Sequence, residues 1–166
     1  MLVTVGWVLG SAEGAEHRRL ETVDATRDGR PVWIDVWLPA SPRPAPVVLL
    51  SHGAMGAAMG LSGLASELAG RGYLVAGVNH YGESFVYGPD TVDPSNVLRM
   101  WLRPPDLSHA LDVVLAELPD RADLERVAAL GHSSGGHTAI AVAGGRMVTA
   151  ALAAYCASAA AAADRG

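Results

Sequence analysis

The pattern of hydrophobic and polar positions changes character at about Pro46. Before that point, residues 32–38 alternate Val, Ile, Val and Leu with Trp, Asp and Trp. Residues 18–26 alternate more loosely, and a turn is expected at residues 27–31. Alternation with a period of two is typical of half-buried strands. The two segments therefore predict an antiparallel hairpin at one edge of a sheet.

From Pro46 onward, continuous apolar runs alternate with helical stretches. The expected strands are 46–50, 73–78 and 126–130, and the expected helices are 60–70, 105–118 and the segment after Gly136. Apolar strands that alternate with helices favour a parallel sheet covered on both faces, which is an α/β fold. Right-handed crossovers would then place the carboxyl ends of these strands, with Ser51, Asn79 and Gly131, along one rim.

Residues 131–135 read Gly-His-Ser-Ser-Gly and match the pattern G-x-S-x-G, between the last expected strand and its helix. In this setting the motif forms a sharp turn that exposes the serine hydroxyl, and its glycines let strand and helix approach without a side-chain clash. The first amides of the helix point to the same place, which favours developing negative charge. The motif predicts Ser133 as a nucleophile; the alternative is an ordinary turn whose residues suit a tight bend.

The strand 46–50 is followed by Ser51 and by His52-Gly53-Ala54-Met55-Gly56, which we name the oxyanion loop (residues 52–56). Its small residues would let a backbone N–H come within hydrogen-bond distance of a substrate oxygen. The expected donors are the amide of Ala54 or Met55 and the amide of Ser134. A plain loop between a strand and a helix is the alternative.

Together, LLSHGAMG (49–56) and ALGHSSGGHTA (129–139) resemble the α/β-hydrolase superfamily. Within it, the likeness is to dienelactone hydrolase-like and platelet-activating-factor acetylhydrolase-like esterases. It runs from about Leu20 to Met147, and segments 33–39, 78–84 (with His-x-Gly) and 103–107 (Arg-Pro-x-Asp) also fit. The resemblance implies a three-layer sandwich with a mostly parallel sheet and an N-terminal antiparallel hairpin. It also implies hydrolysis of carboxylic esters or lactones through a Ser133 acyl-enzyme, with no cofactor.

Length, charge and cysteine count exclude several classes of function. The chain has 166 residues, half of them apolar, which suits one domain with its own core. A scattered net charge of −5 gives no basic patch for nucleic acid or an anionic membrane. The resemblance implies a small-molecule ester as the partner. No apolar run approaches the roughly 20 residues of a membrane span. The single cysteine, Cys156, excludes an internal disulfide, and no Cys/His cluster has the spacing of metal ligands.

The chain divides into three expected regions: a leader or weak signal-like segment at 1–17, a partial hydrolase domain at 18–148 and an alanine-rich helical tail at 149–166. No Lys or Arg precedes the apolar stretch of the leader. Because secretory signals begin with positive charge, this slightly favours the cytoplasm and leaves the periplasm or secretion open.

Several polar residues lie close to the expected rim. His52 is expected to brace the oxyanion loop, and His80 is either loop scaffolding or a substrate contact. Asp106 is expected to cap the helix 105–118. The loop 81–103 carries Tyr81, Phe85, Tyr87, Met100 and Trp101, and it either walls an acyl or alkyl pocket or packs over the sheet.

The partners of a catalytic serine are missing from this sequence. A serine needs a base and an orienting acid, which in this fold follow it in the order Ser, Asp or Glu, His. After Ser133 the only acid is Asp164, and no histidine follows His137. We therefore expect the N-terminal part of a hydrolase, truncated after the helix of the serine turn and weak or inactive alone. The alternatives are an assembly module that self-associates or binds a complementary chain through the unpaired edge of residues 127–130, and an enzyme that uses His80 or His52 as base.

Overall fold

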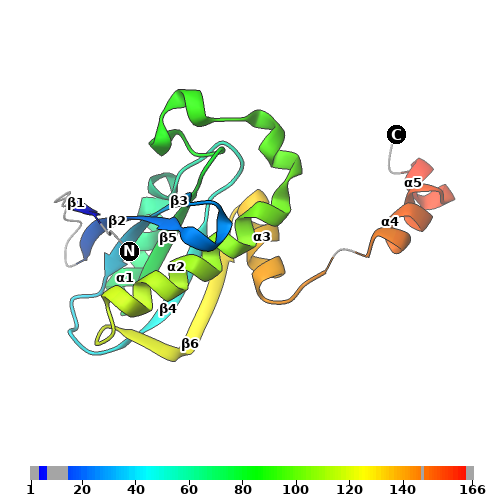
Figure 1. Ribbon diagram of the computed structural model, residues 1–166. Helices are drawn as coiled ribbons and strands as arrows, with labels where there is room; N and C mark the ends of the chain where they lie inside the picture. The colour runs from blue at the N-terminus through cyan, green and yellow to red at the C-terminus, as the bar shows by residue number, and fades with distance from the viewer. Residues whose placement is uncertain (1–3, 7–14, 147, 164–166) are drawn as a thin grey trace.

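The computed structural model describes residues 4–6, 15–146 and 148–163 (Figure 1). Its strands are β1 (Thr4–Gly6), β2 (Glu16–Asp24), β3 (Arg30–Leu38), β4 (Ala45–Ser51), β5 (Leu74–His80) and β6 (Ala122–Gly131). Its α-helices are α1 (Ser62–Gly70), α2 (Arg103–Glu117), α3 (Ser134–Val142), α4 (Thr149–Cys156) and α5 (Ala159–Ala163). Short 3-10 helices are η1 (Ala25–Arg27), η2 (Ala58–Leu61), η3 (Phe85–Tyr87), η4 (Pro89–Thr91), η5 (Pro94–Leu98) and η6 (Met100–Leu102).

The strands form one mixed sheet in the order β1-β2-β3-β5-β4-β6. Antiparallel pairs join β1 to β2, β2 to β3 and β3 to β5, whereas β4 pairs parallel to both β5 and β6. Ser51 is opposite Val78 on β5 and opposite Gly131 on β6, so the carboxyl ends of the three parallel strands meet at one rim. The predicted N-terminal hairpin and the predicted rim are both confirmed.

Helices cover both faces of the sheet, so the α/β-hydrolase-type fold class is confirmed (Figure 1). Helix α2 packs Leu107, Ala110 and Val114 into the larger core cluster, and Ala129 and Val142 pack against the same cluster. On the other face, the alanines of α1 pack against side chains that include Trp37 and Val75. Strand β5 is buried along its whole length, as its continuous apolar pattern predicts.

The cap prediction at Asp106 is wrong. Helix α2 begins at Arg103, its N-cap residue Leu102 makes no side-chain cap bond, and Asp106 lies inside the first turn. The Asp106 side chain is completely buried and points to cations on other elements. Tertiary ion pairs therefore decide its position, and local capping does not.

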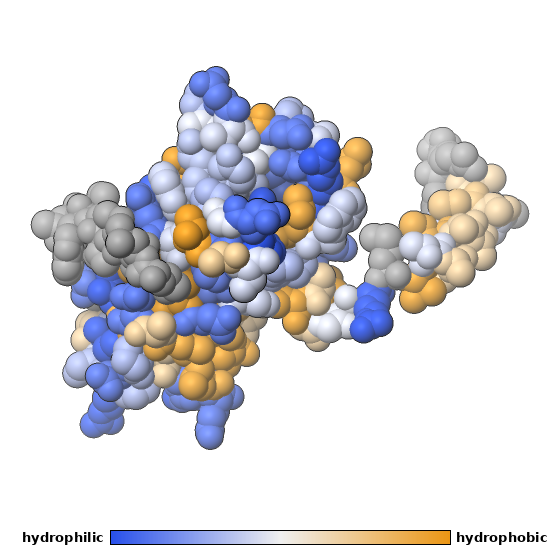
Figure 2. All heavy atoms as spheres, viewed as in Figure 1, coloured by the Kyte–Doolittle hydropathy of each residue, from blue (hydrophilic) through white to orange (hydrophobic). Residues whose placement is uncertain are grey.

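Strand β6 ends the sheet of the described residues, so the far side of its backbone has no strand beside it there. Its Val127 and Leu130 side chains are each 39% exposed. Helices α4 and α5 stand away from the sheet, and much of the surface they present in Figure 2 is apolar. No side chain of α4 is buried. The parallel half of the sheet thus has an open apolar edge beside the rim.

The expected leader is described only in part. Residues 4–6 pair with β2, and Glu16 and His17 belong to β2 itself. Residues 1–3 and 7–14 of the leader, and residues 164–166 of the tail, lie outside the described residues. Within the described ranges, no helix combines the length and hydrophobicity that crossing a membrane requires.

Candidate active site

Ser133 occupies a strained turn between β6 and α3. Its φ of 53° and ψ of −121° lie in a region that residues with a side chain rarely adopt, and its side chain is exposed. Such a conformation costs about 1–3 kcal/mol and persists only where the surroundings impose it. Here the Gly135 N–H donates to the carbonyl of His132 and the Gly136 N–H to the carbonyl of Ser133, each at 2.8 Å. The His132 N–H donates to the carbonyl of Ser51 at 3.2 Å, which fixes the turn to β4.

The two glycines of the motif are required by this close approach. A Cβ on Gly131 would lie 2.1 Å from the carbonyl oxygen of Gly135, and a Cβ on Gly135 would lie 2.0 Å from that of Ser51. Real Cβ atoms do not come within 3.0 Å of backbone atoms. The expected reason for these glycines, close packing of strand and helix, is confirmed.

The oxyanion loop lies against the same turn. A Cβ on Gly53 would be 3.5 Å from the Cβ of Ser133. A cavity of about 270 Å³ lies between the loop and the serine, and its lining includes His52, Gly53, Ala54, His132 and Ser133. Within the described chain, the N–H groups of Ala54, Met55 and Ser134 have no hydrogen-bond partner. Backbone donors without an internal partner are what the binding of an anionic oxygen beside the serine would require.

A completely buried chain of hydrogen bonds lies behind the rim. The Ser51 Oγ is 2.9 Å from Nε2 of His80, and Nδ1 of His80 is 2.8 Å from a carboxylate oxygen of Asp106. Burial lowers the pKa of His80 to about 4, so the ring is neutral at pH 7. Because the carboxylate only accepts, Nδ1–H donates to Asp106 and Nε2 accepts from the Ser51 hydroxyl.

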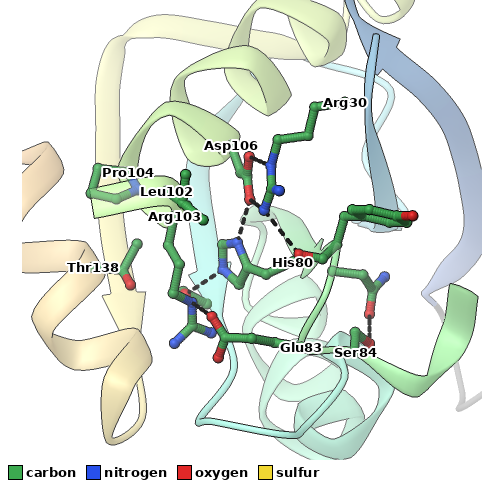
Figure 3. A network of polar contacts seen from close by, with 12 residues as sticks. Arg30, His80, Glu83, Ser84, Leu102, Arg103, Pro104, Asp106 and Thr138 are labelled. Carbon is green, nitrogen blue, oxygen red and sulfur yellow. Dashed lines mark hydrogen bonds and ion pairs between the residues drawn. The ribbon is translucent and has the colours of Figure 1, made fainter. Parts of the chain in front are cut away.

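Asp106 gathers basic side chains from the N-terminal hairpin. Arg30 donates two hydrogen bonds to it, at 2.8 and 3.1 Å, and Arg27 forms an ion pair with it at 2.7 Å. Burial raises the pKa of Asp106, but hydrogen bonds from His80 and Arg30 outweigh that effect and lower it to about 2. The carboxylate is therefore charged, and it ties α2 to β3 and β5 (Figure 3).

His52 is buried beside this network. Its Nδ1 is 2.6 Å from the carbonyl oxygen of Gly53, and its Nε2 accepts from the backbone N–H of His80 at 3.3 Å. The Nη2 of Arg103 donates to the His52 carbonyl at 2.5 Å. Burial lowers the pKa of His52 to about 3, so this ring is neutral as well. In the described residues, no three His, Cys, Asp or Glu side chains gather as metal ligands would.

The family model for chlorophyllase matches residues 11–160. The chain belongs to the chlorophyllase family. No curated protein matches this sequence. The fold relation is supported by solved structures of esterases and other hydrolases, in agreement with the α/β-hydrolase resemblance of the sequence.

Three solved structures show how far this likeness extends. Ferulic acid esterase from Streptomyces cinnamoneus is 25% identical, with a TM-score of 0.61 over 75% of this chain and 54% of that chain. A cold-adapted esterase from an Arctic intertidal metagenomic library is 23% identical (TM-score 0.60, 80% and 57% of the two chains). An S-formylglutathione hydrolase from Agrobacterium tumefaciens is 19% identical (TM-score 0.57, 86% and 57%). This member of the chlorophyllase family therefore spans little more than half the length of each of these three structures.

The structure of this chlorophyllase-family chain brings Ser133, Ala54 and His52 around one cavity, with Met55 and Ser134 next to them in sequence. It places His80 away from solvent, with both ring nitrogens hydrogen-bonded to protein groups. Packing over the sheet, one of the two predicted roles of the loop 81–103, is seen in the structure. Walling an acyl or alkyl pocket stays a prediction, because the groove that the loop lines does not include Ser133. The Tyr87 hydroxyl bonds the backbone of Trp33 and Asn79, whereas Trp101 is 68% exposed and lines a groove of about 630 Å³ with Leu98 and His137.

Sequence reasoning missed the network itself. It did not connect Ser51, His80 and Asp106, and it gave no role to Arg30 or Arg103 individually. The Arg-Pro-x-Asp segment at 103–106 was the available signal, because it places a cation and an acid one turn apart at a helix start beside the rim.

Proposed function

We propose that this chlorophyllase-family chain carries the nucleophile and the oxyanion hole of a serine hydrolase for carboxylic esters or lactones. The observation that carries the proposal is the exposed Ser133 side chain at positive φ, on a cavity whose loop has unpaired backbone donors. An ester carbonyl would lie over Ser133 with its oxygen accepting from Ser134 N–H and from Ala54 or Met55 N–H. As the serine oxygen adds to the carbonyl carbon, a base takes the hydroxyl proton. The bond to the alcohol oxygen then breaks, the alcohol leaves with that proton, and water hydrolyses the acyl-enzyme to the acid and free serine.

Neither His52 nor His80 suits the role of general base. A base must have a ring nitrogen free to take the serine proton. Both nitrogens of His80 are engaged inside the protein, and both nitrogens of His52 contact backbone groups. We therefore propose that the base and its orienting acid come from residues outside this sequence. Alone, the chain would retain oxyanion-hole and binding catalysis, roughly 10³–10⁴-fold over water.

Replacing the nucleophile tests the proposal. Ser133→Ala should remove the part of the hydrolysis of a short p-nitrophenyl ester that passes through an acyl-enzyme, and it should leave the part that the oxyanion hole and binding supply. Initial rates of the purified wild-type and variant chains give the comparison. Ser41→Ala, in an exposed connection, is the matched control and should keep the wild-type rate. Equal rates for wild type and Ser133→Ala would remove Ser133 as nucleophile.

A second candidate function is a non-catalytic assembly module. It is favoured by the open edge of β6, where Val127 and Leu130 are partly exposed beside unpaired backbone groups. Such edges pair with other strands, and charged side chains block that pairing. Light scattering should therefore show the wild-type chain as a dimer or larger species and Val127→Lys as a smaller one. A monodisperse wild-type monomer at micromolar concentration would exclude this candidate.

A further inference from the structure

The guanidinium of Arg103 joins the first turn of α2 to the oxyanion loop. Its side chain is only 1% exposed, and its Nη2 donates to the backbone carbonyl of His52. We infer that Arg103 is a positioning residue that holds the amides of the oxyanion loop toward the substrate oxygen. This inference rests on the proposed function, which gives that loop its role.

The contact controls more than one peptide group. A carbonyl and the N–H of the following residue belong to one rigid plane, so fixing the His52 carbonyl also fixes the Gly53 N–H. The loop then closes on itself, because the Gly56 N–H donates to the Gly53 carbonyl at 3.2 Å. Ala54 and Met55 lie inside this closed turn. A shift of the His52 carbonyl therefore moves both candidate donors relative to Ser133.

Arg103 is itself held from two directions (Figure 3). Its Nε lies 3.6 Å from a carboxylate oxygen of Glu83, and the N–H of Glu83 donates to the carbonyl of His80. Three residues along α2, Asp106 binds His80 and Arg30. These contacts fix both the guanidinium and the helix that carries it against β5 and the hairpin.

Space filling alone does not account for an arginine at this position. A buried cation is costly unless its hydrogen bonds are satisfied. Yet Nε and Nη1 of Arg103 and one carboxylate oxygen of Glu83 have no hydrogen-bond partner in the described chain. An apolar side chain would avoid these losses. The bond from Nη2 to the loop carbonyl needs a side-chain donor, which an apolar residue lacks, and this points to a role in placing the loop.

Two substitutions at Arg103 test the inference in the full chain. Arg103→Met removes the donor and keeps the apolar stem, while Arg103→Lys keeps one donor. Arg103→Met alone would leave the buried Glu83 carboxylate without its cation, which could prevent folding. The double variant Arg103→Met/Glu83→Gln removes that charge as well and separates this effect from the loss of the loop contact. Arg71→Met replaces an exposed arginine on the surface next to α1 and is the matched control. The measurements are hydrogen exchange of the Gly56 amide and the Ser133-dependent ester hydrolysis, resolved into kcat and KM.

We expect the Gly56 amide to exchange ~10-fold faster in both Met variants, because the loop loses its anchor. The Ser133-dependent kcat should fall ~10-fold with KM nearly unchanged, since the donors act on the transition state. Arg103→Lys should recover part of both effects, and Arg71→Met should change neither. Wild-type exchange and kcat in the double variant would overturn the inference. Insensitivity of hydrolysis to Ser133→Ala would instead overturn the proposed function, and the Gly56 exchange would still decide whether Arg103 holds the loop.

Discussion

Gly135→Ala is expected to lower the free energy of unfolding by more than about 4 kcal/mol, which places it among the most damaging single substitutions. The added methyl would lie 2.0 Å from the carbonyl oxygen of Ser51 and 2.8 Å from that of His52. Both neighbours are backbone atoms, so neither can rotate away, and α3 would have to separate from β4. Urea denaturation followed by circular dichroism measures the change.

Gly63→Ala is the matched control for this substitution. Gly63 lies in α1, and nothing stands within 4 Å of the position its Cβ would occupy. Alanine in a helix is favoured over glycine by up to about 1 kcal/mol, so this variant should be as stable as the wild type or slightly more stable. Equal stability of the two variants would show that α3 and β4 are not packed as closely as described.

Acidification is expected to destabilise the protein already between pH 6.5 and 4, above the range in which Asp106 is protonated. Burial lowers the pKa of His80 to about 4 and that of His52 to about 3, whereas both imidazoles have a pKa near 6.5 in the unfolded chain. Below pH 6.5 these two histidines bind protons in the unfolded chain but remain unprotonated in the folded chain. Stability that is fully present above pH 6.5 is therefore lost as the pH falls toward 4, with a slope of up to about 1.4 kcal/mol per pH unit for each histidine.

Urea midpoints between pH 7.5 and 4.5 measure this slope. His80→Gln should be less stable at pH 7.5, because Gln cannot reproduce both ring contacts, and its pH slope should be about half that of the wild type. Asp106 acts in a lower range. Its folded pKa of about 2 means that its contribution is present above pH 4 and is lost only as the pH falls toward 2. A flat profile from pH 7.5 to 5 would contradict the neutral, buried state of both histidines.

The hydrophobic pattern was sufficient to predict most of the architecture. The hairpin, the parallel strands and the helices follow from periodicities of two and 3.6 residues, which report burial directly. The turn at Ser133 was predictable for a similar reason. A glycine on each side of a serine, between a strand and a helix, encodes a local steric requirement that the clashes at Gly131 and Gly135 explain.

The polar network was not predictable in the same way. Arg30 and Asp106 are 76 residues apart in sequence, and Ser51 and His80 are 29 apart, so no local pattern connects them. Asp106 near a helix start looks like a cap, and only the tertiary arrangement of Arg27, Arg30 and His80 shows why it turns inward. Which side chains pair across a sheet depends on which strands become neighbours, and the local sequence around one residue does not specify the strand order.

The buried Ser51–His80–Asp106 chain carries a more general consequence. The hydroxyl, imidazole and carboxylate are hydrogen-bonded in the same order as in a catalytic triad, yet Ser51 has no exposure to solvent. No ester can reach that oxygen, and the imidazole has nowhere to send a proton. Among the described residues, the buried Ser51 hydroxyl thus has a hydrogen-bonded histidine and no exposure, whereas the exposed Ser133 side chain has no histidine hydrogen-bonded to it.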